Sequence, residues 1–363
     1  MVGAGPVGLA LGADLRARGI DVEILERRTG IDDGTRAIGI HSPALALLEV
    51  SGATDALLER AVTIRRGEAR ADGRLLAAIR FDRLRARHPY VAALPQADTT
   101  AVLTALAPPV RRGVQVTAVV DDGAGVRVET DEGDVRAGLV VVASGWSGRS
   151  LVYRPGAVHT RHYPDRYAMV DTVGAGGPTA LVHLERDGVI ESFPLPGGRR
   201  RVVAWTGRDE VADAAGFLRD AVAARTGVDI DTAGASTFRV RRAVAPALRR
   251  GRVFVVGDAA HEVSPIGGQG MNLGLLDALT LSPLLTAWVR SGRDDGLARW
   301  EGDRLASARH AARLAALNTV LGRAAGRTAH AARSLALRTV LRGPGAEAFA
   351  RAYAMRFDRA ARG

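Results

Sequence analysis

Residues 252–277, which run RVFVVGDAAHEVSPIGGQGMNLGLLD, join an apolar strand to a helix through a glycine-rich loop. The first residues form a continuous apolar run of the kind that a buried parallel strand requires. Gly257 and Asp258 follow this run, and the carboxylate can accept hydrogen bonds from the hydroxyls of a polyol. The loop then opens a helix near Met271, whose first N–H groups lack intrahelical partners and carry the positive end of the helix dipole. The stretch therefore predicts a site that binds a polyol-bearing ligand and stabilises negative charge on it.

A second glycine motif stands at the start of the chain, where residues 3–8 are Gly-Ala-Gly-Pro-Val-Gly. Its first glycine allows a tight turn, its second lets a pyrophosphate approach the backbone, and its third lets a helix pack on a strand. We expect a helix from about Val7 to Arg18 and then a strand over Asp21–Glu26. Glu26 follows the last glycine at roughly the 20-residue distance at which an acid accepts hydrogen bonds from a ribose. The motif predicts a dinucleotide site.

Only Met1 and Val2 precede this loop, whereas a strand usually has about five residues. The first strand therefore looks clipped, and we expect the native start to lie upstream. A phosphate loop without a full strand beside it is expected to be poorly anchored in the sheet.

The remaining pattern predicts an α/β protein with two interleaved domains and a helical C-terminal tail. Residues 139–143 form a buried-strand pattern, residues 160–240 alternate as antiparallel strands, and the chain after about residue 275 is almost all helical. We predict a Rossmann-like dinucleotide-binding domain and a second domain built on an antiparallel sheet. The predicted ranges are 1–61, 93–155 and 245–290 for the first domain, 62–92 and 156–244 for the second, and 291–363 for the tail.

The composition excludes several classes of protein. The chain has 363 residues, of which 47% are hydrophobic and none is cysteine, so disulfides and thiolate metal sites are excluded. No apolar run approaches the roughly 18 residues of a membrane helix, and no signal peptide opens the chain, so we expect a cytoplasmic protein. All 50 basic residues are arginine, giving a net charge of +11. They are spread along the whole chain, so we predict no nucleic-acid partner.

In their order along the chain, these motifs resemble the group A flavin-dependent aromatic hydroxylases, the family typified by 4-hydroxybenzoate hydroxylase. The resemblance implies that the first domain is an FAD-binding Rossmann-like domain of the glutathione-reductase type and that the antiparallel-sheet domain is the substrate domain. Arg36 in Thr-Arg-Ala-Ile-Gly and Gln96 in Leu-Pro-Gln-Ala-Asp are weaker matches. The resemblance implies that the flavin ring faces Pro265, Gly267, Gly268 and Gln269. It implies FAD contacts from Gly3, Gly5, Pro6, Val7, Gly8, Glu26, Arg27, Arg36, Gln96, Gly257, Asp258, Pro265, Gly268, Gly270, Met271 and Asn272.

The resemblance also implies an activity. NAD(P)H would reduce the FAD, dioxygen would form a flavin C4a-hydroperoxide, and one oxygen atom would pass to an aromatic or polyketide-like small molecule. The chemistry would belong mostly to the cofactor, and no side-chain nucleophile is required. The expected partners are therefore the small aromatic substrate and dioxygen, with the protein a monomer or homodimer.

One segment departs from the family pattern. The usual Asp-Gly-x-x-Ser-x-x-Arg stretch is matched here by residues 143–154, where Ser144 replaces the acid and Arg149 comes about two residues late. The lost carboxylate puts the use of NAD(P)H in doubt. Together with the clipped strand, Ser144 keeps two alternatives open: a flavin-dependent reductase or dehydrogenase of the same fold, and a non-catalytic flavoprotein remnant.

For several residues and segments we favour a structural role over a catalytic, metal-binding or membrane-binding one. We predict that His261 is structural and that His41, His159, His162 and His183 form no metal site. Arg199–Arg201 follow Pro-Gly-Gly and are interpreted as a solvated hairpin turn. From Arg323 onward the chain is a basic amphipathic segment that could lie on a membrane surface. We favour a helix pair packed on the FAD-binding domain with its arginines outward.

Overall fold

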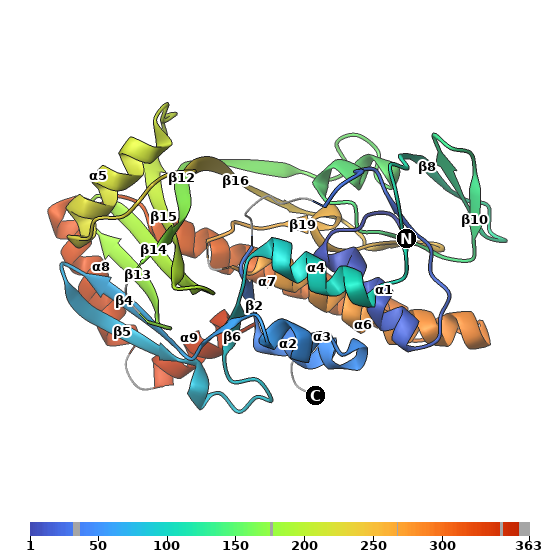
Figure 1. The fold of residues 1–363 in the computed structure, drawn as a ribbon, viewed down its shortest axis with the longest axis horizontal. Helices are drawn as coiled ribbons and strands as arrows, with labels where there is room; N and C mark the ends of the chain where they lie inside the picture. Colours follow the sequence, from blue (N-terminus) through green and yellow to red (C-terminus); the bar gives the residue numbers. More distant parts are fainter. Residues whose placement is uncertain (32–36, 175–176, 267, 342–343, 356–363) are drawn as a thin grey trace.

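The computed structural model describes residues 1–31, 37–174, 177–266, 268–341 and 344–355. The molecule is elongated in Figure 1, with the N-terminus and a parallel sheet toward one end and a large antiparallel sheet at the other. The two longest helices run between these ends. They are α6 (Gly270–Ser291) and α7 (Leu297–Leu321).

The parallel sheet is built around Val2, which bridges Leu25 on one side and Val142 on the other. Val2 N donates to Val141 O at 2.9 Å, and Gly3 N donates to Leu25 O at 2.8 Å. The expectation of a poorly anchored phosphate loop is therefore wrong, because the two residues before the loop are bonded to both neighbours. The strands of this sheet are β1 (Ile24–Glu26), β7 (Val110–Arg112), β11 (Val140–Val142), β18 (Val253–Val255) and β17 (Arg249–Arg250).

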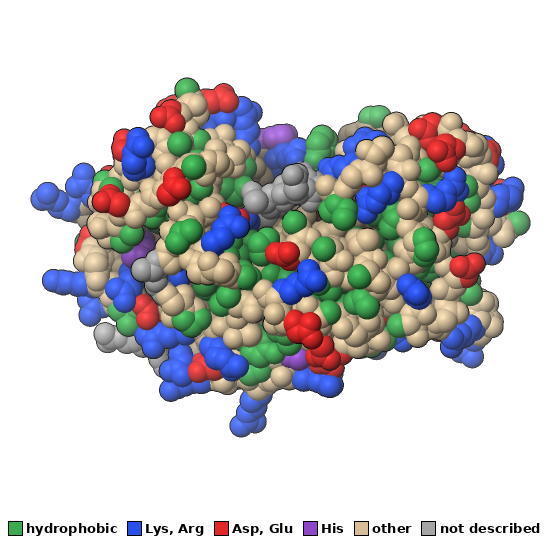
Figure 2. All heavy atoms as spheres, in the orientation of Figure 1, with side chains coloured by type: hydrophobic (Ala, Val, Ile, Leu, Met, Phe, Trp, Pro, Cys, Tyr) green, Lys and Arg blue, Asp and Glu red, His purple; other side chains and the backbone are tan. Residues whose placement is uncertain are grey.

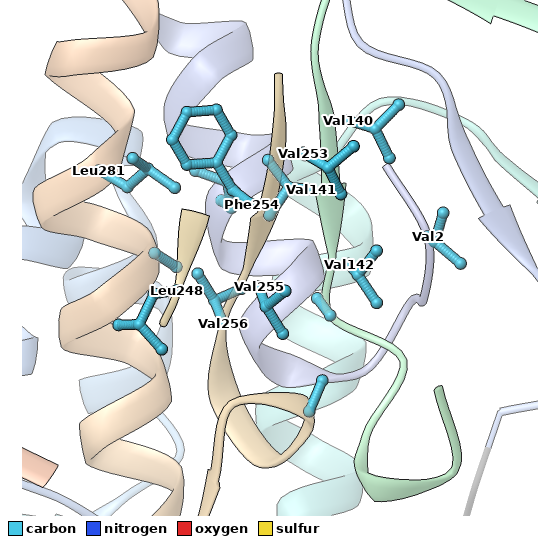
Figure 3. Packing of buried hydrophobic residues seen from close by; sticks show 14 of the residues in the cluster. Val2, Val140, Val141, Val142, Leu248, Val253, Phe254, Val255, Val256 and Leu281 are labelled. Carbon is cyan, nitrogen blue, oxygen red and sulfur yellow. The ribbon is translucent and has the colours of Figure 1, made fainter. Parts of the chain in front are cut away.

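The side chains of this sheet form the main core. Val2 lies beside β11, which separates it from β18, and Phe254 of β18 projects toward Leu281 of α6 (Figure 3). The two central strands are Val-Val-Val (β11) and Val-Phe-Val (β18), because both faces of the sheet are covered there and β-branched side chains pack well in it.

Helix α1 (Pro6–Ala17) packs on α6 at one face of this sheet. Helix α6 has the length and the mean hydropathy, 1.2, of a membrane-spanning helix, but 67% of its apolar window is buried inside the protein. We therefore interpret it as the core helix around which the cofactor-binding end is built. The further helices at this end are α2 (Ser42–Leu48), α3 (Ala53–Leu58) and α4 (Gln96–Leu106).

The other end is an eight-stranded sheet in the order β19-β16-β12-β15-β14-β13-β4-β5, antiparallel except between β13 and β4. Helix α5 (Ala214–Thr226) covers one of its faces. The strands are β4 (Arg66–Ala71), β5 (Arg74–Arg80), β12 (Thr160–Val173), β13 (Ala180–Glu185), β14 (Gly188–Leu195), β15 (Arg199–Gly207), β16 (Ser236–Val244) and β19 (His261–Glu262). Residues from 66–80 and from 160–244 thus share one sheet.

Two small sheets complete the fold. The first, β2-β6-β3, lies between the two ends, and the second, β8-β9-β10, packs beside the parallel sheet (Figure 1). Their strands are β2 (Gly39–Ile40), β3 (Val62–Ile64), β6 (Val91–Ala93), β8 (Val116–Asp121), β9 (Val126–Thr130) and β10 (Val135–Ala137).

The C-terminal helices α8 (Arg327–Val340) and α9 (Pro344–Tyr353) pack against β5 of the large sheet. Two arginines of this region turn inward. Arg323 forms an ion pair with Asp165 at 2.7 Å, and Arg333 donates to the carbonyls of Leu184 and Glu185 at 3.0 Å. The expectation that the arginines point outward is therefore wrong for Arg323 and Arg333. The predicted packing is observed in part, because Met355, just after α9, packs against Leu273 and Leu276 of α6, while α8 and α9 contact β5. The inward guanidiniums satisfy a carboxylate and strand carbonyls that would otherwise be buried unpaired.

The arginines at 199–201 also differ from the prediction. They begin β15 rather than a solvated turn, and Arg200 and Arg201 are buried. Arg200 donates to the side chain and the carbonyl of Ser192, and Arg201 makes a bidentate pair with Asp171 at 2.6 and 2.8 Å. The buried charge is tolerated because these partners replace its water.

Arginines and acidic side chains are interspersed over the face seen in Figure 2 rather than gathered into one stripe.

Candidate functional site: one cavity from the glycine loop to the large sheet

A single cavity of about 1020 Å³ joins the two ends of the molecule. It begins at the glycine loop and Glu26, passes the carboxyl ends of β11 and β18, and reaches one face of the eight-stranded sheet. Ligands of open parallel sheets bind outside the carboxyl ends of the strands. The topology therefore places a ligand across the parallel sheet and leaves the sheet face for a second molecule.

Two of the three glycines in the first loop have no space for a side chain, and the third does. Gly3 has φ +106, and a Cβ atom on it would lie 2.7 Å from Ala143 O. A Cβ atom on Gly8 would lie 2.2 Å from Gly3 O, whereas one on Gly5 would meet no protein atom within 4 Å. The fold thus requires glycine at positions 3 and 8. At position 5 the space that a side chain would occupy is part of the cavity.

The start of α1 faces the same cavity through Gly5, Pro6 and Val7. Gly5 caps the helix without a side-chain hydrogen bond, so the first-turn N–H groups have no protein acceptor from the cap. Such a helix start binds phosphate groups well.

Glu26 ends β1 at the cavity wall. Its Oε2 accepts a hydrogen bond from Ala4 N at 2.8 Å, and its Oε1 accepts one from Arg28 N at 2.9 Å. A carboxylate has about four acceptor positions, so both oxygens can still accept from a sugar hydroxyl.

The second glycine loop approaches the first through close packing. A Cβ atom on Gly274 would lie 2.8 Å from Gly257 Cα and 2.6 Å from Val7 Cγ2. This glycine, which the sequence analysis missed, lets α6 press against both loops. The exposed side chain of Asp258 lines the cavity beside them.

Arg149 holds the segment that carries Asp258. Its guanidinium donates to the carbonyls of Asp258 at 2.8 Å and Ala259 at 3.2 Å and pairs with Glu262 at 2.8 Å. Arg149, which comes about two residues late in the 143–154 segment, therefore holds the backbone of the loop at Asp258 and Ala259. The hydroxyl of Ser144, at the cavity wall, has no hydrogen-bond partner among the described residues.

Asn272 is fully buried and joins three segments. Its Oδ1 accepts from His41 N at 2.8 Å, and its Nδ2 donates to Gly39 O at 2.8 Å and Gly268 O at 3.1 Å. Gln96 makes a similar link at the start of α4, where its Oε1 accepts from Ala37 N at 3.2 Å. These amides fix the backbone around the cavity.

Most residues expected at the cofactor lie at the cavity wall. They are Gly3, Gly5, Pro6, Val7, Glu26, Arg27, Gln96, Gly257, Asp258, Pro265, Gly268, Gly270 and Met271. Gly8, Gln269 and Asn272 do not line it: the first packs on the loop, and the other two are buried. Arg36 and Gly267 lie outside the described residues.

His261 is buried away from the cavity, as predicted for a structural residue. Its Nε2 lies 2.6 Å from Asp277 Oδ2, and Asp277 Oδ1 accepts from Arg304 Nε at 2.8 Å. Burial opposes the ionisation of Asp277, but the charges of His261 and Arg304 outweigh it and lower the pKa of this carboxyl. Within the described residues, no group of three His, Asp or Glu side chains could hold a metal ion.

The far part of the cavity is mainly apolar, with Glu68, Arg201, Asn318 and Tyr353 among its polar lining residues, and it includes one buried acid that the sequence analysis missed, Glu191 on β14. Met169, Val182 and Val203 of the sheet and Leu337 of α8 surround this part. Glu191 is 4% exposed, and burial raises its pKa to about 7. The available signal was the alternation of 189–193, which places Glu191 on the same strand face as Val189 and Phe193.

The raised pKa predicts a pH-dependent stability. A carboxyl whose folded pKa lies above its unfolded value of 4.5 destabilises the protein as the pH rises from about 4.5 to 7. We expect E191Q to be about as stable as the wild type at pH 4.5 and more stable by up to about 3 kcal/mol at pH 8. Urea unfolding at both pH values measures this difference. E347Q, which alters an exposed acid of α9, is the control, and an unchanged pH dependence in E191Q would contradict the prediction.

The fold and the cavity define a protein that binds a dinucleotide cofactor in one part of a cavity whose other part is mainly apolar. The chain belongs to the family described as FAD binding domain, whose model matches residues 1–315, and within it resembles the flavin-dependent aromatic hydroxylases.

The relatives agree with this class. The chain is 32% identical to a rifampicin monooxygenase of Streptomyces venezuelae over 82% of this chain and 65% of that protein. It is 30% identical to an anhydrotetracycline monooxygenase of Streptomyces rimosus over 80% of this chain and 62% of that protein. The chain thus spans slightly less than two thirds of these relatives. The structure of p-nitrophenol 4-monooxygenase from Pseudomonas putida DLL-E4 matches with a TM-score of 0.87 at 23% identity, over 99% of this chain and 97% of that one, which shows the fold.

Proposed function

We propose that this protein is an FAD-dependent monooxygenase that uses NAD(P)H and dioxygen to hydroxylate an aromatic or polyketide-like small molecule. The observation that carries the proposal is the continuous cavity, which joins a dinucleotide-type glycine loop to an apolar pocket large enough for a second molecule. The proposal assigns the cofactor to the segments 1–61, 93–155 and 245–290 and the substrate to 62–92 and 156–244. We propose a cytoplasmic monomer or homodimer.

The residues present fit FAD. The cradle of Gly3 and Gly8, the open space beside Gly5 and the start of α1 would hold the pyrophosphate. Glu26 would accept from the ribose, and Asp258 from the ribitol. The unpaired hydroxyl of Ser144 supplies one further donor at the cavity wall.

When bound, FAD would supply the redox chemistry, taking a hydride from NAD(P)H and passing one atom of dioxygen to the substrate. The chain's own residues would position the cofactor and the substrate and would keep water away from them. The start of α6, at Gly270 and Met271, turns its free N–H groups and positive dipole end toward the cavity, where negative charge develops. The apolar wall of the large sheet keeps water from the reacting atoms.

The experiment begins with the purified full chain. Flavin absorption bands in the protein, together with NAD(P)H oxidation and oxygen consumption that depend on an added phenol, are the expected results. Mass spectrometry should find one added oxygen atom in the product. NAD(P)H oxidation without an oxygenated product would favour the reductase alternative. A folded protein that binds no FAD would overturn the proposal and favour the non-catalytic alternative.

A further inference from the structure

Glu191 is an acid without a protein partner in the apolar wall of the cavity. It lies on β14 between two strands, and its cross-strand neighbours are Val182 and Val203. Val189 and Phe193, two residues to either side, line the cavity with it. Within the part of the chain that the structure describes, burial is the sole cause of its shifted pKa, and no hydrogen bond or ion pair holds its carboxylate.

The charged and titratable groups around Glu191 do not neutralise it. Arg201 of β15 also faces the cavity, but its guanidinium is held by Asp171 in the bidentate pair. Tyr167 of β12 and Tyr353 of α9 are the nearby titratable groups, and their pKa values are raised, first by their own burial and further by the charge of Glu191.

Glu68 of β4 also lines the cavity, and its carboxylate is paired with Arg66 and Arg70, each at 2.8 Å. Four further lining groups are uncharged. Asn318 comes from α7, Leu337 from α8, Val182 from β13 and Ala69 from β4. Arg323, beyond Tyr167, is paired with Asp165. A buried carboxyl that lacks a partner costs the fold several kcal/mol relative to an apolar residue. Groups held at such a cost in a cavity are candidates for function.

We propose that Glu191 accepts a hydrogen bond, and then the proton, from a phenolic hydroxyl of the substrate, because it lines the cavity between Val182 and Val203 and no group among the described residues donates to its carboxylate. This inference rests on the proposed monooxygenase function and adds a catalytic residue and a substrate feature to it.

The step that Glu191 performs is a proton transfer. The O–H bond of the phenol breaks, an O–H bond forms on the carboxylate, and the electron pair stays on the phenol oxygen. The resulting phenolate is richer in electrons at its ortho and para carbons, which are the positions that an electrophilic oxygen attacks. A base with a pKa near 7 is well matched to this task at neutral pH.

The residues that line this part of the cavity indicate which kind of substrate fits it. Met169, Val203 and Phe193 of the sheet line the cavity, as do Leu341 and Phe349 from the region of α8 and α9. A flat, apolar ring system fills such a space, and a hydroxyl on it would be desolvated at Glu191. The site therefore selects a planar phenol over the same ring without an O–H group.

The test measures binding to the FAD-loaded, oxidised protein without NAD(P)H, so that no turnover occurs. The probes are 2-naphthol and 2-methoxynaphthalene, which share one ring system but differ in the O–H donor. At pH 8 we expect the wild type to bind the naphthol at least tenfold more tightly than the ether by calorimetry. We expect this preference to fall below threefold in E191L. The exposed-acid control E347Q should keep the wild-type ratio.

E191Q gives a second, independent readout, because glutamine can accept a hydrogen bond but cannot take the proton. Affinity of the wild type for 2-naphthol should rise between pH 6 and pH 8 as Glu191 ionises, and in E191Q it should not. An equal preference in the wild type and E191L, no naphthol binding by the wild type, or an unchanged pH response in E191Q would overturn the inference. Failure of the proposed function would appear separately, as absent FAD or absent substrate-dependent oxygen consumption.

Discussion

Replacing Asp277 by asparagine is expected to lower the free energy of unfolding by about 3–5 kcal/mol, because it removes the carboxylate that α6 offers to the buried guanidinium of Arg304. Asp277 is fully buried and bonded to His261, to Arg304 and, through Oδ2, to Gly257 N at 3.2 Å. These bonds tie α6 and α7 to the loop that carries Asp258. Urea unfolding of the wild type and D277N at pH 7 measures the loss.

The control is D294N, which removes an exposed carboxylate paired with Arg249. A surface pair of this kind contributes about 0–1 kcal/mol. The lowered pKa of Asp277 also sets the direction with pH: its stabilisation is complete above the unfolded pKa of about 3.9 and is lost as the pH falls through the folded value. The gap between wild type and D277N should therefore narrow in acid. A loss in D277N no larger than that in D294N would refute the assignment.

Local patterns predicted the framework of the cofactor end. The spacing of the two glycine loops follows from steric demands that any sequence must meet, so Gly3, Gly257 and the start of α6 could be placed without coordinates. The buried-strand pattern at 139–143 is also observed, as β11 (Val140–Val142). The strand predicted over 21–26 shrinks to Ile24–Glu26, because its partner β7 offers only three paired residues.

Long-range pairing could not be predicted. Arg201 looks like part of a solvated turn until Asp171, 30 residues earlier, is brought opposite it on β12. Asn272 was expected at the cofactor, but its amide reaches Gly39 and His41, more than 200 residues away. Glu191 was missed for the same reason, since its isolation depends on which strands lie beside β14. Polar residues of the substrate end are therefore the ones whose roles sequence alone leaves open.

Alanine substitutions in the glycine loop should separate the needs of the fold from those of the cofactor. In G3A the new Cβ would lie 2.7 Å from Ala143 O on a backbone with φ +106, so the loop must move. In G5A no protein atom lies within 4 Å of the Cβ, so the cofactor-free protein should unfold within about 1 kcal/mol of the wild type. Both variants should bind FAD at least roughly 100-fold more weakly, which corresponds to about 3 kcal/mol.

G3A and G5A should lose FAD affinity for different reasons. The free energies of unfolding of the two cofactor-free proteins distinguish these reasons. G3A should lose both stability and FAD, because its strained loop adjoins the central strand at Val2. G5A should lose FAD alone, because the space beside Gly5 is open to the cavity and a pyrophosphate would lie there. G52A is the control: Gly52 has φ +73 and no atom within 4 Å, but it lies away from the cavity, so G52A should lose some stability and keep its FAD affinity. Wild-type FAD affinity in G5A would mean that the pyrophosphate does not approach this glycine. The cofactor would then have to lie against the second glycine loop, the one that carries Asp258, instead.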